Sequence, residues 1–227
     1  FVPSFLFMAA DDLAALRAIY VATGGPSTWI RNGCWDNDTV PVCWWDQVLC
    51  NTTTWRVIEL RFASNNMVGA LPEELGMLGA LRVCWTSAEL KTLSLYPRSF
   101  IRLFSHNDFQ HATLPSAHLE VLQLTFNRGL SGVLPQSLGN LSNLKRLYAW
   151  NTSLVGIPET IGGLHNLIAI DLTDNLIQGP VPLAIARLTN VDTVYFDGNE
   201  GITCPLDAPV QKWLDGVKYH ADPCASS

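Results

Sequence analysis

The sequence is poor in charge and has no long apolar run. Asp, Glu, Lys and Arg make up 15% of its 227 residues, against about 25% in an average soluble domain. Lys and Arg number 14, form no basic run, and leave a net charge of −6. Binding of nucleic acid or of an anionic membrane surface is therefore not expected. No stretch of 18 or more apolar residues occurs, so no helix within the given chain is expected to span a bilayer.

The sequence also lacks the motifs of the common catalytic sites. It has no G-x-S-x-G, no H-E-x-x-H, no Walker loop and no G-x-G-x-x-G. His106 and His111, with Asp108, are the one candidate metal cluster, but their spacing matches no recognised motif and surface residues are the alternative interpretation. No pair of carboxylates is identifiable as acid and base. We therefore expect no enzyme, no cofactor and no metal.

What is present indicates an extracellular protein. Residues 1–10 are uncharged, mostly apolar and end in Ala9-Ala10, which is typical of the end of a signal peptide, with an ordinary apolar segment as the alternative. Five of the six cysteines lie near the two ends of the chain, which favours disulfide-bonded ends in an oxidising compartment. The cysteines are Cys34, Cys43, Cys50, Cys84, Cys204 and Cys224, and their number does not give the pairing. The sequons expected to carry glycans begin at Asn37, Asn51, Asn140 and Asn151.

An internal repeat dominates the middle of the chain. The pattern L-x-x-L-x-L-x-x-N-x-L is followed by G-x-[ILV]-P, and its most regular copy runs from Leu167 to Pro182. The other copies are 57–72, 119–135, 144–158 and 191–205. Five copies predict a leucine-rich-repeat solenoid, an α/β repeat fold. No single repeat can bury its apolar face alone, so stacking of repeats supplies the core.

The chemistry of the repeat predicts its local structure. The L-x-L alternation predicts a short strand with one face inward. Asparagines after the strand, at Asn65, Asn127, Asn175 and Asn199, are expected to bond backbone groups of neighbouring turns. The glycines that precede the prolines, Gly69, Gly132, Gly156 and Gly179, permit a bend that a side chain would obstruct. The copy at 144–158 deviates, because Thr152 stands at the asparagine position and one residue is missing after Gly156.

The expected organisation is a repeat array between two caps. We divide the chain into four parts. Residues 1–10 are the signal-peptide remnant and residues 11–54 an N-terminal cap. Residues 55–203 contain five to six repeats, and residues 204–227 form a C-terminal cap. Asp11 or Asp12 is expected to cap a first helix that runs through Ile19. Residues 82–103 are irregular, and an insertion, two degenerate repeats and a gene-model artefact all fit this segment. We favour the insertion.

The repeats and caps together resemble the plant-type extracellular leucine-rich repeat family. The second half of its repeat is found at 135–141 and 158–164, and 43–50 resembles its N-terminal cap motif C-x-W-x-G-V-x-C, with Gln47 in place of the usual Gly. Members include receptor-like kinase and receptor-like protein ectodomains and polygalacturonase-inhibiting proteins. The resemblance implies a right-handed solenoid whose caps contain the disulfides Cys43–Cys50 and Cys204–Cys224. Cys34 and Cys84 are left over.

A binding surface is the function that remains. In this fold the residues that flank the inward strand positions line the concave face. The predicted ligand-binding residues are Arg61, Gln123, Phe126, Arg146, Tyr148, Trp150, Asp171 and Tyr195. Thr125 and Ala169 are also expected on this face by their spacing. Tyr148, Trp150 and Tyr195 form an aromatic group of the kind that anchors interfaces, with local packing as the alternative.

Three hypotheses follow for the function. The first is a secreted or cell-surface module, such as a receptor ectodomain, that binds a protein, peptide or carbohydrate ligand through its concave face. The second is a secreted inhibitor of a cell-wall hydrolase. The third is a structural cell-surface protein, which predicts a chemically uniform face that the varied concave residues do not offer. Membrane attachment outside the given chain stays open.

Overall fold

The computed structural model describes residues 10–52, 56–79, 119–221 and 223–224. Their central element is a seven-stranded sheet in the order β1-β2-β4-β6-β8-β10-β12. The strands are β1 (Val48–Cys50), β2 (Val57–Arg61), β4 (Val121–Gln123), β6 (Arg146–Tyr148), β8 (Ala169–Asp171), β10 (Thr193–Tyr195) and β12 (Tyr219–Ala221). β1 is antiparallel to β2, and the pairs that follow are parallel. Parallel neighbours in chain order are what a solenoid requires, because each turn returns the chain to the same place one step along the axis.

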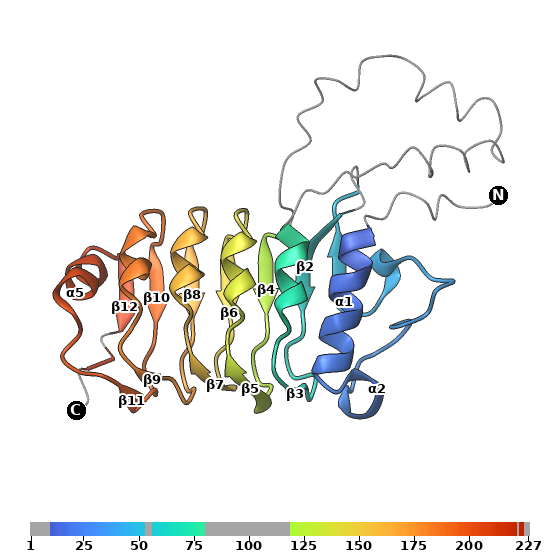
Figure 1. Cartoon of the computed structure of the whole chain (residues 1–227), viewed down its shortest axis with the longest axis horizontal. Coiled ribbons are helices and arrows are strands. Elements are labelled where there is room, and N and C mark those ends of the chain that lie inside the picture. The colour runs from blue at the N-terminus through green and yellow to red at the C-terminus, as the bar shows by residue number, and fades with distance from the viewer. Residues whose placement is uncertain (1–9, 53–55, 80–118, 222, 225–227) are drawn as a thin grey trace, which may run out of the picture.

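Each turn continues from its sheet strand into a second layer and then into a short 3-10 helix. The second layer consists of β3 (Val68–Gly69), β5 (Gly129–Val133) and β7 (Ser153–Gly156), and of the pair β9 (Gln178–Gly179) and β11 (Gly201–Ile202). The 3-10 helices are η2 (Glu73–Gly79), η5 (Gln136–Asn140), η6 (Glu159–Gly163) and η7 (Leu183–Arg187). Figure 1 shows these turns side by side along one axis, which confirms the predicted solenoid.

The core lies between the sheet and the two other layers. In each repeat strand the residue that the register aligns with Leu122 points inward and is fully buried, as the L-x-L pattern predicts. These residues are Leu60, Leu122, Leu147, Ile170 and Val194, which the register aligns across the sheet. A second buried row follows two positions later, with Phe62, Leu124, Ala149, Leu172 and Phe196.

The N-terminal end of the core is covered by aromatic side chains. α1 (Ala10–Ala22) and α2 (Gly25–Thr28) are followed by η1 (Val42–Trp44). Trp29 and Trp35 pack on Phe62 of the first repeat at ring-centroid distances of 5.0 and 5.6 Å. The indole N–H groups of Trp29, Trp35 and Trp45 donate to the backbone oxygens of Thr23, Asp46 and Val40. The cap thus closes an apolar edge with these three indole donors paired.

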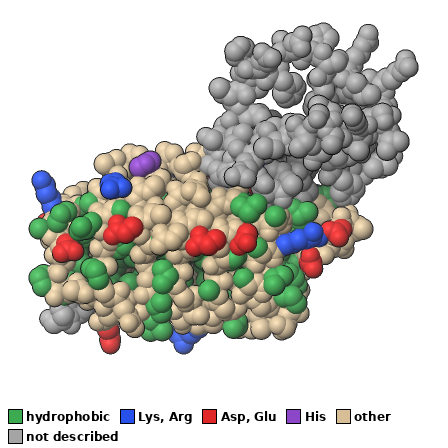
Figure 2. Space-filling model, viewed as in Figure 1, with side chains coloured by type: hydrophobic (Ala, Val, Ile, Leu, Met, Phe, Trp, Pro, Cys, Tyr) green, Lys and Arg blue, Asp and Glu red, His purple; other side chains and the backbone are tan. Residues whose placement is uncertain are grey.

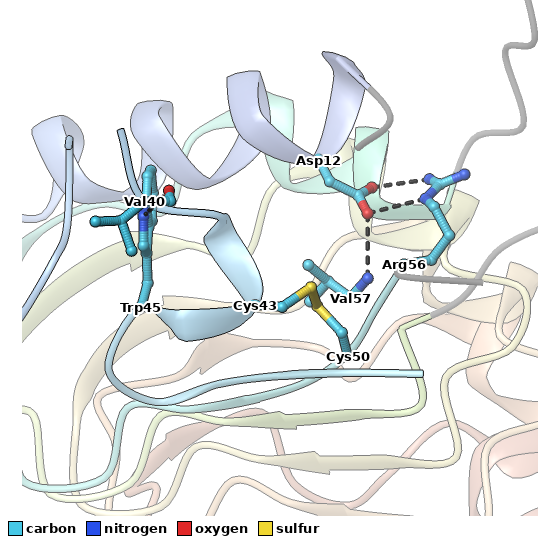
Figure 3. Close-up of a disulfide and its surroundings, with 7 residues drawn as sticks. All are labelled: Asp12, Val40, Cys43, Trp45, Cys50, Arg56 and Val57. Carbon is cyan, nitrogen blue, oxygen red and sulfur yellow. Dashed lines mark hydrogen bonds and ion pairs between the residues drawn. A yellow bond between two sulfur atoms is a disulfide. The ribbon is translucent and has the colours of Figure 1, made fainter. Parts of the chain in front are cut away.

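A buried ion pair ties α1 to the first repeat (Figure 3). Arg56 donates to both carboxylate oxygens of Asp12 at 2.9 and 2.8 Å, and the Val57 N–H donates to the same carboxylate at 3.1 Å. The disulfide Cys43–Cys50 lies beside this network. α1 begins at Ala10, before both aspartates, and ends at Ala22. The expectation that Asp11 or Asp12 stands at its N-cap and that it ends at Ile19 is therefore wrong, since Asp12 serves a tertiary contact.

The C-terminal end has its own helix and disulfide. α5 (Ala208–Asp215) packs on η7, and the Trp213 indole donates to the Leu188 carbonyl at 3.0 Å. Cys204 and Cys224 are bonded. The two disulfides are the pairs that the family resemblance implies, so the prediction of disulfide-linked caps is confirmed. Cys34 is exposed and free, whereas Cys84 lies outside the described residues.

β2 pairs directly with β4, although residues 80–118, which lie outside the described residues, come between them in the chain. The irregular segment 82–103 and the candidate metal residues His106, Asp108 and His111 lie outside the described residues. No helix in the described part of the chain has the length and hydropathy needed to cross a membrane.

Candidate binding surface

The outward side chains of the seven-stranded sheet form one continuous face, which we call the sheet face. Side chains of a strand alternate between the two sides of a sheet, so the residues on either side of each buried middle residue point outward. Parallel register aligns them in two rows. The first row is Glu59, Val121, Arg146, Ala169 and Thr193, and the second is Arg61, Gln123, Tyr148, Asp171 and Tyr195.

The register brings the predicted ligand-binding residues together. Five of them occupy the second row, and Arg146 lies in the first row, two residues before Tyr148 on the same strand. Trp150 and Phe126 follow at the edge where the strands end. Two residues expected on this face by spacing offer almost no surface to a ligand, because Thr125 and Ala169 are only 2% and 6% exposed, although the register places Ala169 in the first row. The role of the other residues as ligand contacts stays a prediction.

Phe126 and Trp150 form an aromatic pair at this edge. Their ring centroids are 4.1 Å apart at an interplanar angle of 63°. Phe126 keeps 47% of its surface exposed and has a φ of 58°. Positive φ is costly for a bulky side chain, whereas Asn, Asp, Ser and Gly tolerate it better. The corresponding residues of the other turns are Ser64, Asn151, Asp174 and Gly198, all with positive φ. Backbone preference alone does not explain an exposed aromatic ring at such a position, which makes Phe126 a candidate functional residue.

The positive charges of the sheet face differ in how they are paired. The guanidinium of Arg61 makes two bonds to the carboxylate of Glu59, at 2.7 and 2.8 Å, and these hydrogen bonds raise the pKa of Arg61. Arg146 is exposed and flanked in register by Val121 and Ala169. Within the described part of the chain no side chain pairs with it. Its charge is thus available to a ligand.

The sequons lie at different distances from this face. Asn37 is exposed in the N-terminal cap and Asn140 is exposed at the end of η5. Asn151 follows Trp150, is half-buried, and accepts a hydrogen bond from Arg128 at 2.7 Å. Asn51 is half-buried after β1. Glycosylation of the four sites stays a prediction, and a glycan on Asn151 would stand beside the aromatic pair.

Other surfaces offer less chemistry. On the face that Figure 2 shows, acidic, basic and hydrophobic side chains are spread singly rather than gathered in one patch. Among the described residues no group of three or more His, Cys, Asp or Glu side chains is placed to hold a metal ion.

Sequence reasoning missed two parts of the sheet face. β12 extends the sheet beyond the last repeat and pairs Tyr219 with Thr193, although residues 204–227 were expected to form only a cap. Its three residues, Tyr-His-Ala, lack the L-x-L signal. The acidic side chains of the turns around β8 and β10 come from separate repeats, so no local motif marks them; the charge of each turn is the signal that distinguishes them.

Comparisons with known proteins find similarity to plant proteins that are named as receptor-like proteins. No protein-family model matches it. It is 28% identical over 151 residues to the Arabidopsis thaliana "Putative receptor-like protein 8", and 30% identical over 151 residues to "Receptor-like protein 9a" of the same plant. Each match covers 65% of this chain, but only 14% and 15% of the relative. The chain therefore spans about a seventh of the length of these relatives.

Two solved plant structures share the fold. The BIR2 ectodomain from Arabidopsis thaliana has a TM-score of 0.64 at 22% identity, with 95% of this chain and 97% of that chain covered. The leucine-rich-repeat ectodomain of GASSHO1/SCHENGEN3, in complex with CASPARIAN STRIP INTEGRITY FACTOR 2, has a TM-score of 0.66 at 20% identity. That match covers 93% of this chain and 21% of the receptor. Both likenesses show the architecture.

Proposed function

Because the chain resembles the plant-type extracellular leucine-rich repeat proteins in repeats, caps and fold, we propose that it is a non-catalytic recognition module of the cell surface or extracellular space. It binds a protein or peptide partner through the sheet face. The solved relative GASSHO1/SCHENGEN3 is itself in complex with a named factor, which supports this class of function. The module acts by contact between a preformed surface and its partner, with no covalent step.

The observation that carries the proposal is the aromatic group on the sheet face. Tyr148 ends β6, Trp150 follows two residues later, and Phe126 packs on Trp150 from the neighbouring turn. Aromatic side chains contribute large contact area at low entropic cost and dominate many interfaces. They lie on a sheet whose backbone is fixed by pairing on both sides, so little ordering free energy is needed when a partner binds.

The test is a binding screen of the purified, glycosylated protein. Extracellular peptides and receptor ectodomains are screened first, with extracellular glycans and secreted hydrolases as further arms. We expect a partner whose binding is lost in the double variant Tyr148→Ala/Trp150→Ala. Leu183→Ala is the matched control, because Leu183 is an exposed apolar residue on η7, in the helical layer rather than on the sheet face.

The outcomes separate the functions. Binding that survives the double variant moves the site away from the sheet face and contradicts the proposal. If a glycan or a hydrolase binds and its binding depends on Tyr148 and Trp150, the sheet face remains the binding site but the partner class changes. Binding of a hydrolase would favour the inhibitor hypothesis. Circular dichroism of each variant shows whether the fold is kept.

A further inference from the structure

We propose that the ligand of the sheet face is a peptide with a fixed order of charges. An acidic residue of the peptide lies over the half of the face formed by β4 and β6, and a basic residue of the peptide lies over the half formed by β8 and β10. An aromatic or apolar residue of the peptide lies between them. This inference rests on the proposed function and specifies its ligand. The order of charges follows from the way unpaired charges are divided between the two halves.

The β4–β6 half carries the guanidinium of Arg146, and Arg128 adds a second guanidinium in the turn between β4 and β5. No described carboxylate neutralises either of them. Arg146 stands in the first row of the face and makes no ion pair. Arg128 lies two residues after Phe126. Among the described residues, its side chain donates only to the neutral amide oxygen of Asn151. The ion pairs in this part of the molecule are Arg61–Glu59 and Lys145–Glu120. In the sequence, Arg146 lies two residues before Tyr148 and Arg128 two residues after Phe126, so both belong to the turns that carry the aromatic group.

The β8–β10 half carries the opposite charge. Its carboxylates are Asp171, Asp174, Asp192 and Asp197, on two adjacent turns. None of the four forms an ion pair with a described residue. Asp171 accepts from the Thr173 N–H at 3.0 Å, Asp197 from the Thr173 hydroxyl at 3.3 Å, and Asp192 from the Thr193 hydroxyl at 2.8 Å. These partners are neutral, so no ion pair with a described residue neutralises these carboxylates.

The boundary between the two halves falls beside the aromatic group. Tyr148 on β6 is paired in register with Asp171 on β8, and Asp171 with Tyr195 on β10. Neighbouring strands are about 4.8 Å apart, so the second row from Arg61 to Tyr195 spans roughly 19 Å. An extended peptide rises about 3.3 Å per residue, and about six residues cross the face.

A peptide fits this pattern better than other ligand classes. Nucleic acids and acidic glycans carry charge of one sign, so the β8–β10 half would repel them. A neutral glycan would use the aromatic rings but neither set of charges. A peptide can carry both signs together with an aromatic residue, and complementary charges then fix its direction on the face.

The experiment selects random twelve-residue peptides on phage against the intact glycosylated protein. Selected peptides are synthesised and their affinity is measured by titration calorimetry. We expect an acidic and a basic residue in constant order around an aromatic or aliphatic residue. Arg146→Glu is expected to weaken these peptides at least tenfold, and Asp197→Lys likewise. Replacing the acidic residue of the peptide by Lys restores binding to Arg146→Glu.

Controls keep the result interpretable. Arg187→Glu reverses an exposed charge on η7, in the helical layer, and is expected to leave the affinity unchanged. Arg146→Gln and Asp197→Asn remove the same charges with less disturbance, so the test stands even if a reversal variant does not fold.

Several results would overturn the inference. Selected peptides of one charge sign, or peptides unaffected by both reversals, contradict the charge order. If no peptide is selected but a protein or glycan binds in a Tyr148- and Trp150-dependent manner, the peptide inference fails and the proposed function survives. If no binding depends on these two residues, both fail. A dimer in sedimentation that dissociates with Arg146→Glu would assign the face to a second copy of the chain.

Discussion

At the scale of single residues, Phe126 is a position where the effect of a substitution on stability can be distinguished from its effect on binding. Its ring is exposed and its backbone has a φ of 58°, at a position where the other turns have Ser, Asn, Asp or Gly. Left-handed backbone costs a non-glycine residue about 1 kcal/mol or more. The contact with Trp150 returns about 0.5–1.5 kcal/mol. The two contributions nearly cancel, so the fold gains little from this residue.

We predict that Phe126→Asn changes the free energy of unfolding by less than about 1 kcal/mol. The same variant weakens the sheet-face partner at least tenfold, because an interface anchor is lost. Urea unfolding and calorimetry measure the two effects separately. Phe62→Ala, which removes a fully buried ring, is the control and should cost about 3–5 kcal/mol. A loss of more than 2 kcal/mol in Phe126→Asn would show that Phe126 is a structural residue.

At the scale of the repeat element, the buried asparagines join neighbouring turns. The amide of Asn175 donates to the carbonyls of Ala149 and Leu172 at 2.8 and 3.0 Å and accepts from the Leu154 N–H at 3.0 Å. Asn127 and Asn199 repeat this arrangement in their own turns. Thr152 stands at the same position but donates within its own turn to Ala149 and toward Asn175. It makes no described bond to the turn before it, so the ladder is interrupted there.

Asn175→Ala is expected to cost about 2–4 kcal/mol of unfolding free energy, because it leaves buried backbone groups without a partner. Asn166→Ala is the matched comparison. Asn166 is exposed and its amide donates once, to the Ser142 carbonyl at 2.8 Å. Its loss should cost less than about 1 kcal/mol. Equal effects of the two substitutions in urea unfolding would mean that the ladder does not hold the turns together.

Two of the 3-10 helices, η5 and η7, are also capped by a glutamate of the preceding turn. Glu73 on η2 accepts from the backbone N–H groups of Gln136 and Ser137 at the start of η5, at 2.9 and 2.7 Å. The bond from Ser137 lowers the pKa of Glu73 below its ordinary value of 4.5. Glu159 makes the corresponding bond to the Ala184 N–H. Glu73 and Glu159 thus cap the 3-10 helices of the turns that follow them, whereas Gln136 stands at this position after Pro135.

A lowered pKa fixes the sign of a pH effect. The ionised carboxylate is the form that the folded state binds, so its stabilisation is complete above pH 4.5 and is lost as the pH falls through the folded pKa. We predict that wild type exceeds Glu73→Gln in unfolding free energy at pH 7 and that the difference shrinks when both are measured near pH 3.5. A difference that is independent of pH would contradict the capping role.

At the scale of the whole molecule, the caps close a core that repeats alone would leave open. The disulfide Cys204–Cys224 encloses a segment of 20 residues that includes α5 and β12. A loop of this length restricts the unfolded chain by about 3 kcal/mol. Cys204→Ser/Cys224→Ser is therefore expected to lower the unfolding free energy by about that amount. A change below 1 kcal/mol would mean that α5 and β12 are held by packing alone.

Much of the architecture follows from the sequence because the repeat is periodic. Leu147, Ile170 and Val194 are buried where the pattern puts them, and the same spacing brings Arg61, Gln123, Tyr148, Asp171 and Tyr195 into one row. Features without periodicity could not be found in this way. The ion pair of Asp12 with Arg56 joins residues 44 positions apart, and Tyr219 joins the sheet without a repeat motif.

The central claim is that the sheet face is the recognition surface. A deep mutational scan of the protein displayed on yeast tests this claim directly. One channel measures the amount of folded protein on the cell surface, and the other measures binding of a selected ligand. The account predicts that substitutions which abolish binding but not folding gather on the outward residues of β4, β6, β8 and β10, with Trp150 and Phe126. Such substitutions gathered on η5, η6 and η7, or in the N-terminal cap, would contradict it.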